Sequence, residues 1–162
     1  MRWIRHLFID DFAARRAVPR ACLAVIERTI AVQEVRHRGE LRFVVEGGLA
    51  VHRLLAWRTA RERAIEVFTQ LRIWDTEDNA GVLIYLLLAD RRVEIVADRG
   101  IDAKVGRTAW DAICGAMQRE FAEGRFEAGA LLGIEAISDL LAEHFPPEEA
   151  NPNELPDTPV VI

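Results

Sequence analysis

Residues 74–102 decide the fold of this chain, and they read WDTEDNAGVLIYLLLADRRVEIVADRGID. An apolar run at residues 82–89 is followed by the polar turn Asp90-Arg91 and by a second apolar run at residues 93–97. Two short apolar runs joined by a tight polar turn predict a β-hairpin. Because antiparallel strands return the chain to the edge that it left, the acids before the first strand should meet those after the second.

The segments on either side of the hairpin predict an α/β protein. Helices are expected at residues 19–37 and about 58–72, with a strand at residues 40–46 between them. Strand, helix and hairpin form a βαβ unit, whose strands should be parallel with a right-handed crossover. Helices at about 105–122 and 126–144 complete a three-layer αβα fold, with a short mixed sheet and helices on both faces.

Length and composition indicate one globular domain. The chain has 162 residues, of which 51% are hydrophobic, so it can bury a core without disulfides or a structural metal. We expect a helical segment at residues 1–17, the domain proper at 18–145 and a disordered tail rich in proline and acid at 146–162. Removing the tail should change the free energy of unfolding by less than ~1 kcal/mol, unless its apolar end docks on the core.

Charge and cysteine content restrict the partners and the compartment. The net charge of −5 argues against non-specific nucleic-acid binding. Cys22 and Cys114 lie in apolar helical surroundings, which favours buried free thiols in a reducing cytoplasm. No apolar run is long enough to span a bilayer, and the N-terminus has no signal-like apolar region, so we expect a cytoplasmic protein without direct membrane insertion. The sequence does not indicate an oligomeric state.

Acidic residues gather at the predicted start of the sheet. If the strands at 40–46 and 81–88 are parallel, their starts share an edge with the end of the third strand. Carboxylates on one rim repel each other, and a hard cation relieves that repulsion by taking oxygen ligands. The candidate metal ligands are Asp75, Asp78, Asn79, Asp98, Asp102 and Glu40. The spacing is not that of an EF-hand, because Gly81 comes one place too late and the distal Glu is missing.

Other interpretations of these residues stay open. Asp78-Asn79 could be a simple turn, and Asp98 could pair with Arg99 or Arg92. Trp74 and Arg99 flank the acidic residues and define a secondary pocket. Ligands of open α/β sheets usually lie at the carboxyl ends of the strands. That end gives another candidate pocket, formed by Glu46, Gly47, Gly48, Asp90, Arg91 and Arg92.

The chain resembles the TPM-domain family, also called the TPM phosphatase family, over roughly residues 18–145. The matching stretches are residues 78–84, residues 90–95, Gly100 with its acidic neighbours, and residues 121–129. The resemblance implies the three-layer fold and a divalent cation at the acidic loop, with Ca²⁺ favoured over Mg²⁺. It also implies partners among other TPM-domain or LemA-type membrane proteins of bacteria.

Motifs for covalent catalysis are missing from the sequence. The single serine, Ser138, lies within a predicted helix, and neither a nucleophile elbow nor a P-loop is present. The first hypothesis is therefore a TPM-domain protein that binds a divalent cation at the acidic loop and acts as a regulatory or protein-interaction module. The alternative is a weak metal-dependent phosphatase, in which a metal held by Asp78 and Asp98 would act with Arg99 on phosphomonoesters.

Overall fold

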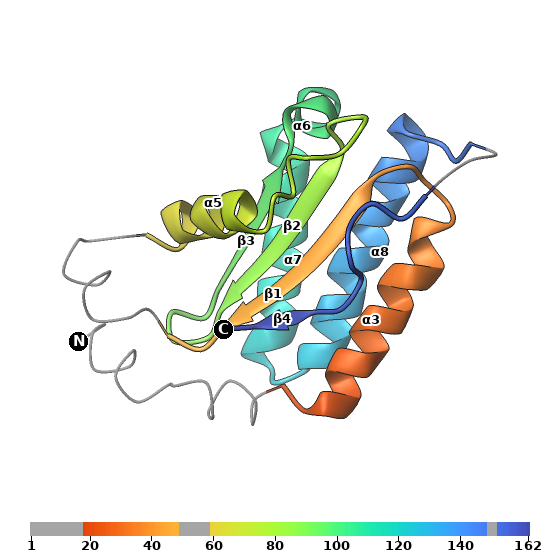
Figure 1. Cartoon of the computed structure of the whole chain (residues 1–162). Coiled ribbons are helices and arrows are strands. Elements are labelled where there is room, and N and C mark those ends of the chain that lie inside the picture. The colour runs from red at the N-terminus through yellow and green to blue at the C-terminus, as the bar shows by residue number, and fades with distance from the viewer. Residues whose placement is uncertain (1–17, 49–58, 149–151) are drawn as a thin grey trace.

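The computed structural model describes residues 18–48, 59–148 and 152–162, and it has the expected three-layer α/β architecture (Figure 1). The four strands of these residues form one sheet in the order β3-β2-β1-β4. Along the chain the elements are α3 (Arg20–Glu34), β1 (Glu40–Glu46), α5 (Ala60–Gln70), β2 (Gly81–Leu87), β3 (Arg92–Ala97), α6 (Arg99–Val105), α7 (Arg107–Ala122), α8 (Phe126–His144) and β4 (Val160–Val161).

The centre of the sheet is the predicted βαβ unit and hairpin. β1 and β2 are parallel, in a register that runs from Glu40 opposite Gly81 to Glu46 opposite Leu87. β3 pairs antiparallel with β2 across a turn at residues 88–91, in which Arg91 has a φ of 51°. Every residue of β2 is buried, as expected for a strand that is covered on both faces. The predicted hairpin is confirmed.

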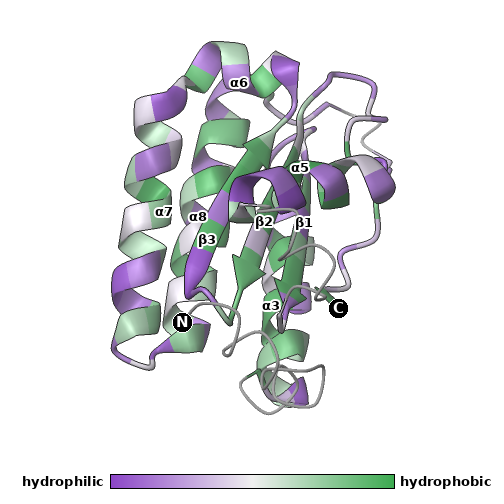
Figure 2. Cartoon of the chain, turned by 90° about the vertical axis from the view of Figure 1, so that its left-hand side faces the viewer, coloured by the Kyte–Doolittle hydropathy of each residue, from purple (hydrophilic) through white to green (hydrophobic). Residues whose placement is uncertain are grey.

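Helices cover both faces of the sheet, as Figures 1 and 2 show. On one face, α3, α7 and α8 bury a core that includes Ile26, Phe43, Ile84, Met117 and Ile134. On the other face, α5 buries a second core that includes Val44, Ala64, Val67, Leu83 and Tyr85. Side chains of β1 and β2 alternate between the two cores because successive residues of a strand point to opposite faces.

Two helices beside the sheet have side-chain caps at their N-termini. Thr59 begins α5 with a capping box, in which its hydroxyl accepts from the backbone N–H of Glu62 and the Glu62 carboxylate accepts from the N–H of Thr59. Asp98 caps α6, a short helix that the sequence did not predict. Seven residues make barely two turns, which is too short for a helical period to be recognised.

The tail differs from the expectation of disorder. Residues 160 and 161 form β4, which pairs parallel with β1 at the edge opposite β3. Leu155, Val160 and Ile162 pack on the core beneath α5. Figure 1 shows the tail, in dark blue, running beside β1 and α3. The expected disorder therefore does not describe residues 152–162.

Two further expectations concern the N-terminus and membranes. The predicted helical segment at residues 1–17 lies outside the described residues. Within the residues that the structure describes, no helix is long and apolar enough to cross a membrane.

Candidate functional site at the acidic loop

The loop before β2 and the turn after β3 meet, as the hairpin predicted. The carbonyl oxygen of Asn79 accepts hydrogen bonds from the backbone N–H groups of Gly100 and Ile101, at 3.0 and 3.3 Å. Asn79 has a φ of 52°, a conformation that Asn adopts more readily than most residues. A Cβ on Gly100 would lie 2.5 Å from the carbonyl oxygens of both Asp78 and Asn79. Glycine at this position therefore lets the two segments touch.

Asp98 lies at the centre of this junction. Its Oδ1 accepts from the backbone N–H of Arg99 at 2.7 Å and so caps α6. Its Oδ2 is buried and has no hydrogen-bond partner in the described part of the chain. A buried carboxylate oxygen without a partner is costly, and it is the one feature of the loop that a bound cation would directly relieve.

The carboxylates next to Asp98 have protein partners. Asp78 pairs with Arg38 at 3.2 Å, and Arg38 also pairs with Glu148 at 2.9 Å. Asp102 lies in α6 and accepts from the indole N–H of Trp110 at 2.9 Å. Asp102 is held by α7 and Asp78 by Arg38, which lies just before β1, so the two carboxylates do not form a ring of free oxygens.

Asp75 and Asn79 also have partners. Asp75 pairs with Arg72 at 2.9 Å on the surface. The Oδ1 of Asn79 accepts from the guanidinium of Arg99 at 3.3 Å, so Arg99 does lie beside the loop. Trp74 is 46% exposed and packs against Arg72, with 5.8 Å between the guanidinium carbon and the ring centroid. Trp74 therefore pairs with Arg72, and Arg99 with Asn79.

Glu40 lies beneath the tail. Its carboxylate is buried and accepts from the backbone N–H groups of Glu154 and Leu155, at 3.0 and 3.1 Å. Burial raises the pKa of Glu40 to about 7, although these two hydrogen bonds lower it. The position of Glu40 at the start of β1, beside the start of β2, was predicted correctly. Its side chain, however, accepts hydrogen bonds from the tail.

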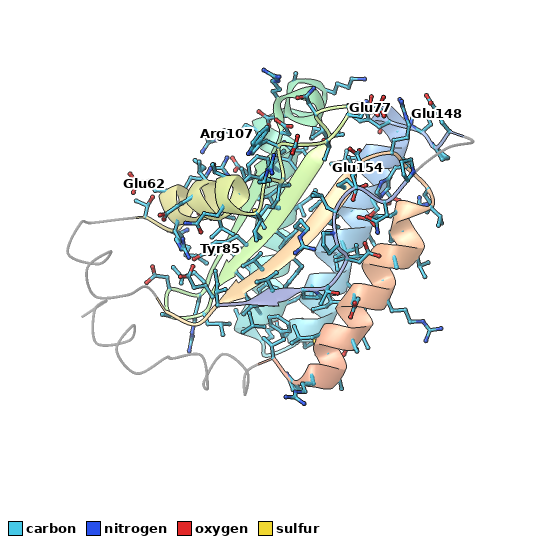
Figure 3. The ribbon with its side chains drawn as sticks, in the orientation of Figure 1. Glu62, Glu77, Tyr85, Arg107, Glu148 and Glu154 are labelled. Atoms are coloured by element: carbon cyan, nitrogen blue, oxygen red, sulfur yellow. The ribbon has the colours of Figure 1, made fainter. Side chains whose placement is uncertain are left out.

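The tail adds acidic residues that sequence reasoning missed. Glu154 accepts from the backbone N–H of Glu77, at 3.2 Å from Oε2, and Figure 3 shows both residues at the same end of the sheet. Asp157 lies near Glu34, and burial, followed by the charge of Glu40, raises the pKa of Glu34 to about 9. A cavity of about 120 Å³ lies beside Glu34 and Asp157 and is lined by Ala31, Glu34, Val35, Gly39, Glu40, Asn153 and Asp157.

These positions allow a test of the expected metal site. Within residues 18–48, 59–148 and 152–162, no three His, Cys, Asp or Glu side chains gather in a way that could hold a metal ion. Asp98 and the loop at residues 78–79 are brought together, whereas Glu40, Asp75 and Asp102 are engaged elsewhere. The residues fit a cation only in part, because Asp78 would have to exchange Arg38 for it.

Comparisons with known proteins assign the chain to a family. The family model of the TPM domain matches residues 21–140. This chain belongs to the TPM-domain family. A search of the curated proteins gives no match.

Two solved structures are similar to this TPM domain. The BA42 protein of the psychrophilic bacterium Bizionia argentinensis, solved by NMR, is 30% identical, with a TM-score of 0.77 over 88% of this chain and 93% of BA42. The N-terminal domain of a P. gingivalis protein is 19% identical, with a TM-score of 0.61 over 80% of this chain and 82% of that domain. The second likeness concerns the fold alone.

The carboxyl end of β1 carries a buried polar network. The Glu46 carboxylate accepts from Nε of Arg63 at 2.8 Å and from the hydroxyl of Tyr85 at 2.6 Å. Burial and the charge of Glu46 raise the pKa of Tyr85. These contacts join α5 to β1 and β2, so in the TPM domain Glu46 supports packing at the edge where the sequence suggested a pocket.

A larger cavity of the TPM domain lies at the β3 edge of the sheet, the edge farthest from β4. It has a volume of about 330 Å³ and lies beside β3, between α5 and α7. Its walls carry charges of both signs, together with Trp110 and Cys114. The lining residues are Arg61, Glu94, Ile95, Ala97, Asp102, Arg107, Trp110, Asp111 and Cys114. Sequence reasoning missed this site because its residues come from four separate elements, α5, β3, α6 and α7.

Proposed function

We propose that the chain is a regulatory or protein-interaction module of the TPM-domain family that binds a divalent cation, Ca²⁺ more readily than Mg²⁺, where the loop at residues 76–79 meets Asp98. The observation that supports the proposal is the buried Oδ2 of Asp98, which has no partner among the described residues. Oxygen ligands suit both cations, and the flexible geometry of calcium suits a site assembled from two loops. Asp78, Asp98 and the amide oxygen of Asn79 are the side chains that would hold the ion.

Cation binding on this proposal competes with an internal cation. Asp78 pairs with the guanidinium of Arg38, and Asn79 accepts from the guanidinium of Arg99. Both acceptors have to leave an arginine before they bind a metal ion. Affinity is therefore set by the difference between two interactions, and removal of Arg38 should strengthen binding.

Thermal unfolding with and without Ca²⁺ or Mg²⁺ tests the proposal. A ligand that binds only the native state stabilises it by ~2.7 kcal/mol at one hundred times its dissociation constant. Asp98→Asn keeps an N-cap on α6 but removes the charge, so it should lose most of this response. Asp139→Asn, which breaks an exposed pair with Arg36, is the matched control and should respond as the wild type does.

A second pair of variants tests the competition. Arg38→Gln should increase the cation response, whereas Glu148→Gln breaks the other ion pair of Arg38 and should leave the response unchanged. If the wild type and Arg38→Gln both fail to respond at millimolar Ca²⁺ and Mg²⁺, the cation site is wrong. A response that persists in Asp98→Asn would place the ion elsewhere.

Weak phosphomonoester hydrolysis is the second candidate function, and the position of Arg99 favours it. Arg99 is exposed and lies beside Asn79, where it could neutralise a phosphate. Without a metal ion the acidic loop repels phosphate, so hydrolysis requires the cation. Turnover of an aryl phosphate only with metal, and its loss in Arg99→Gln, would support this activity. If a cation stabilises the protein but no phosphate is released, the cation-binding proposal stands and the phosphatase proposal is wrong.

Partners remain a proposal that rests on the resemblance. We propose other TPM-domain or LemA-type membrane proteins as partners, as the family resemblance implies. Co-expression of the tagged chain with such a protein, followed by co-purification in the presence and absence of Ca²⁺, tests this. Equal recovery with an unrelated membrane protein would argue against it.

A further inference from the structure

The outer edge of β3 offers backbone hydrogen-bonding groups. The N–H of Asp98 donates to the carbonyl of Gly81 at 2.8 Å, which fixes the alternation of the β2–β3 ladder. Residues 92, 94 and 96 therefore face β2, and Val93, Ile95 and Ala97 turn their N–H and C=O groups outward. In the described part of the chain, no backbone group bonds these outward groups.

Among the residues that the structure describes, side chains alone contact these outward groups. Nη1 of Arg61, from α5, donates to the carbonyl of Ile95. The N–H of Ile95 faces the thiol of Cys114, from α7, whose pKa burial raises to about 11. Sulfur is a weak acceptor, so the N–H of Ile95 is only partly satisfied. Arg61 is half exposed and can leave its carbonyl by changing rotamer.

The edge forms the floor of the 330 Å³ cavity described above, which makes it a groove. In Figure 2, β3 faces the viewer between α7 and α5. Each wall carries an ion pair, Arg61 with Glu94 at 3.8 Å on the α5 side and Arg107 with Asp111 at 3.5 Å on the α7 side. Both pairs are loose, so their charges are available to a ligand.

We propose that this groove binds one extended peptide segment of another protein, which adds to the sheet as a strand beside β3. Strand addition uses main-chain hydrogen bonds for affinity and alternate side chains for selectivity. The segment should carry a basic residue for Glu94, between small or β-branched residues that face α7. The inference deepens the interaction part of the proposed function and is independent of the cation.

The groove selects a single segment over a second copy of the chain. The edge of β3 is recessed between two helices, so a second copy would bring its own α5 and α7 against these walls before its strand reached the floor. A lone strand has no such flanking helices. On binding, Arg61 leaves the carbonyl of Ile95 and turns toward solvent, and the peptide supplies the lost hydrogen bond.

Amide NMR on the full chain tests the proposal. The probe is a capped hexapeptide of alternating threonine and valine with one central lysine. We expect saturable shifts at Val93, Ile95 and Ala97 and slower hydrogen exchange at these amides. The same peptide with alternate backbone nitrogens methylated keeps its side chains but loses its donors, so it should not bind.

Two matched variants test whether the contact of Arg61 with Ile95 limits access to the β3 edge. Arg61→Ala frees the carbonyl of Ile95 and should tighten binding severalfold, whereas Arg107→Ala removes a charge from the other wall without freeing a carbonyl and should not. Equal binding of the methylated peptide would overturn strand addition. So would shifts confined to the acidic loop or β1, or no saturable binding to Arg61→Ala at millimolar peptide. Cation titrations report at Asp78 and Asp98, so failure of either proposal is recognised separately.

Discussion

The two outer edges of the sheet are closed in different ways. At the β1 edge the backbone of the tail pairs with the backbone of β1. The N–H of Ile162 donates to the carbonyl of Val45 and the N–H of Gly47 donates to the carbonyl of Ile162, both at 2.9 Å. At the β3 edge, the backbone groups of Ile95 have two partners among the described residues, the side chains of Arg61 and Cys114. An edge paired with backbone is lost to other partners, whereas an edge guarded by side chains opens by rotamer changes. The tail therefore contributes to the stability of the sheet, whereas the β3 edge can accept another strand.

Deletion of residues 152–162 should have the largest effect. It exposes the part of the second core that Leu155, Val160 and Ile162 cover, and it removes both N–H donors to Glu40. At ~1 kcal/mol for each half-buried apolar side chain, the free energy of unfolding should fall by roughly 3 kcal/mol. Urea denaturation measures this, with Thr158→Ala, which loses one hydrogen bond to Glu27, as a mild control.

If the deletion lowers the free energy of unfolding by less than ~1 kcal/mol, the tail does not stabilise the domain and behaves as its composition predicts. Its prolines and acids are typical of disorder, yet residues 155, 160 and 162 supply apolar contacts. The acceptor for the tail's N–H groups is Glu40, more than one hundred residues earlier in the chain. Composition within a window cannot reveal a partner at that separation.

The rest of the fold was predictable where local signals agree. Gly39, the apolar pattern and Gly47 define β1, whose bounds match the prediction, and Pro146 follows the end of α8. The hairpin predicted that the loops at residues 78–79 and 98–100 meet. The side-chain partners there were not predictable, because Arg38 and Trp110 come from other elements. Antiparallel pairing determines where the backbone returns. It does not determine the side-chain rotamers, which depend on tertiary packing.

The β1 edge should also carry the stronger pH dependence. Burial raises the pKa of Glu40 to about 7 and that of Glu34 to about 9, above the ~4.3 of an unfolded glutamate. For raised pKa values, the stabilising contribution is complete below about pH 4 and is lost as pH rises through about 7 and 9. Glu40→Gln should therefore gain stability relative to the wild type between pH 5 and pH 8.

Denaturation midpoints at these two pH values measure the change. Glu94→Gln, at the β3 edge, is the comparison, because burial raises the pKa of Glu94 but neighbouring arginines lower it. Its pH dependence should be smaller than that of Glu40→Gln. A difference between Glu40→Gln and the wild type that does not vary with pH would show that Glu40 stays ionised beneath the tail.

A smaller effect is expected from the cap of α5, which forms one wall of the β3 groove. Thr59→Ala removes the hydroxyl that accepts from Glu62 and should cost about 1 kcal/mol. Thr69→Ala, in the same helix, removes only a hydroxyl that donates to the carbonyl of Ile65 and should cost less. Equal losses in urea denaturation would mean that the capping box stabilises α5 no more than the Thr69 hydroxyl does.

Hydrogen exchange separates the two edges without perturbing stability. The N–H of Gly47 is bonded by the tail and should exchange slowly, whereas those of Val93 and Ala97 face outward and should exchange quickly. Ile95 should be intermediate, because a thiol is its acceptor. Deleting the tail should make Gly47 fast and leave Ile95 unchanged, whereas Arg61→Ala should alter neither amide, since Arg61 bonds a carbonyl. If Val93 and Ala97 were as slow as Gly47, the β3 edge would already be covered, and a peptide could add there only by displacing its cover.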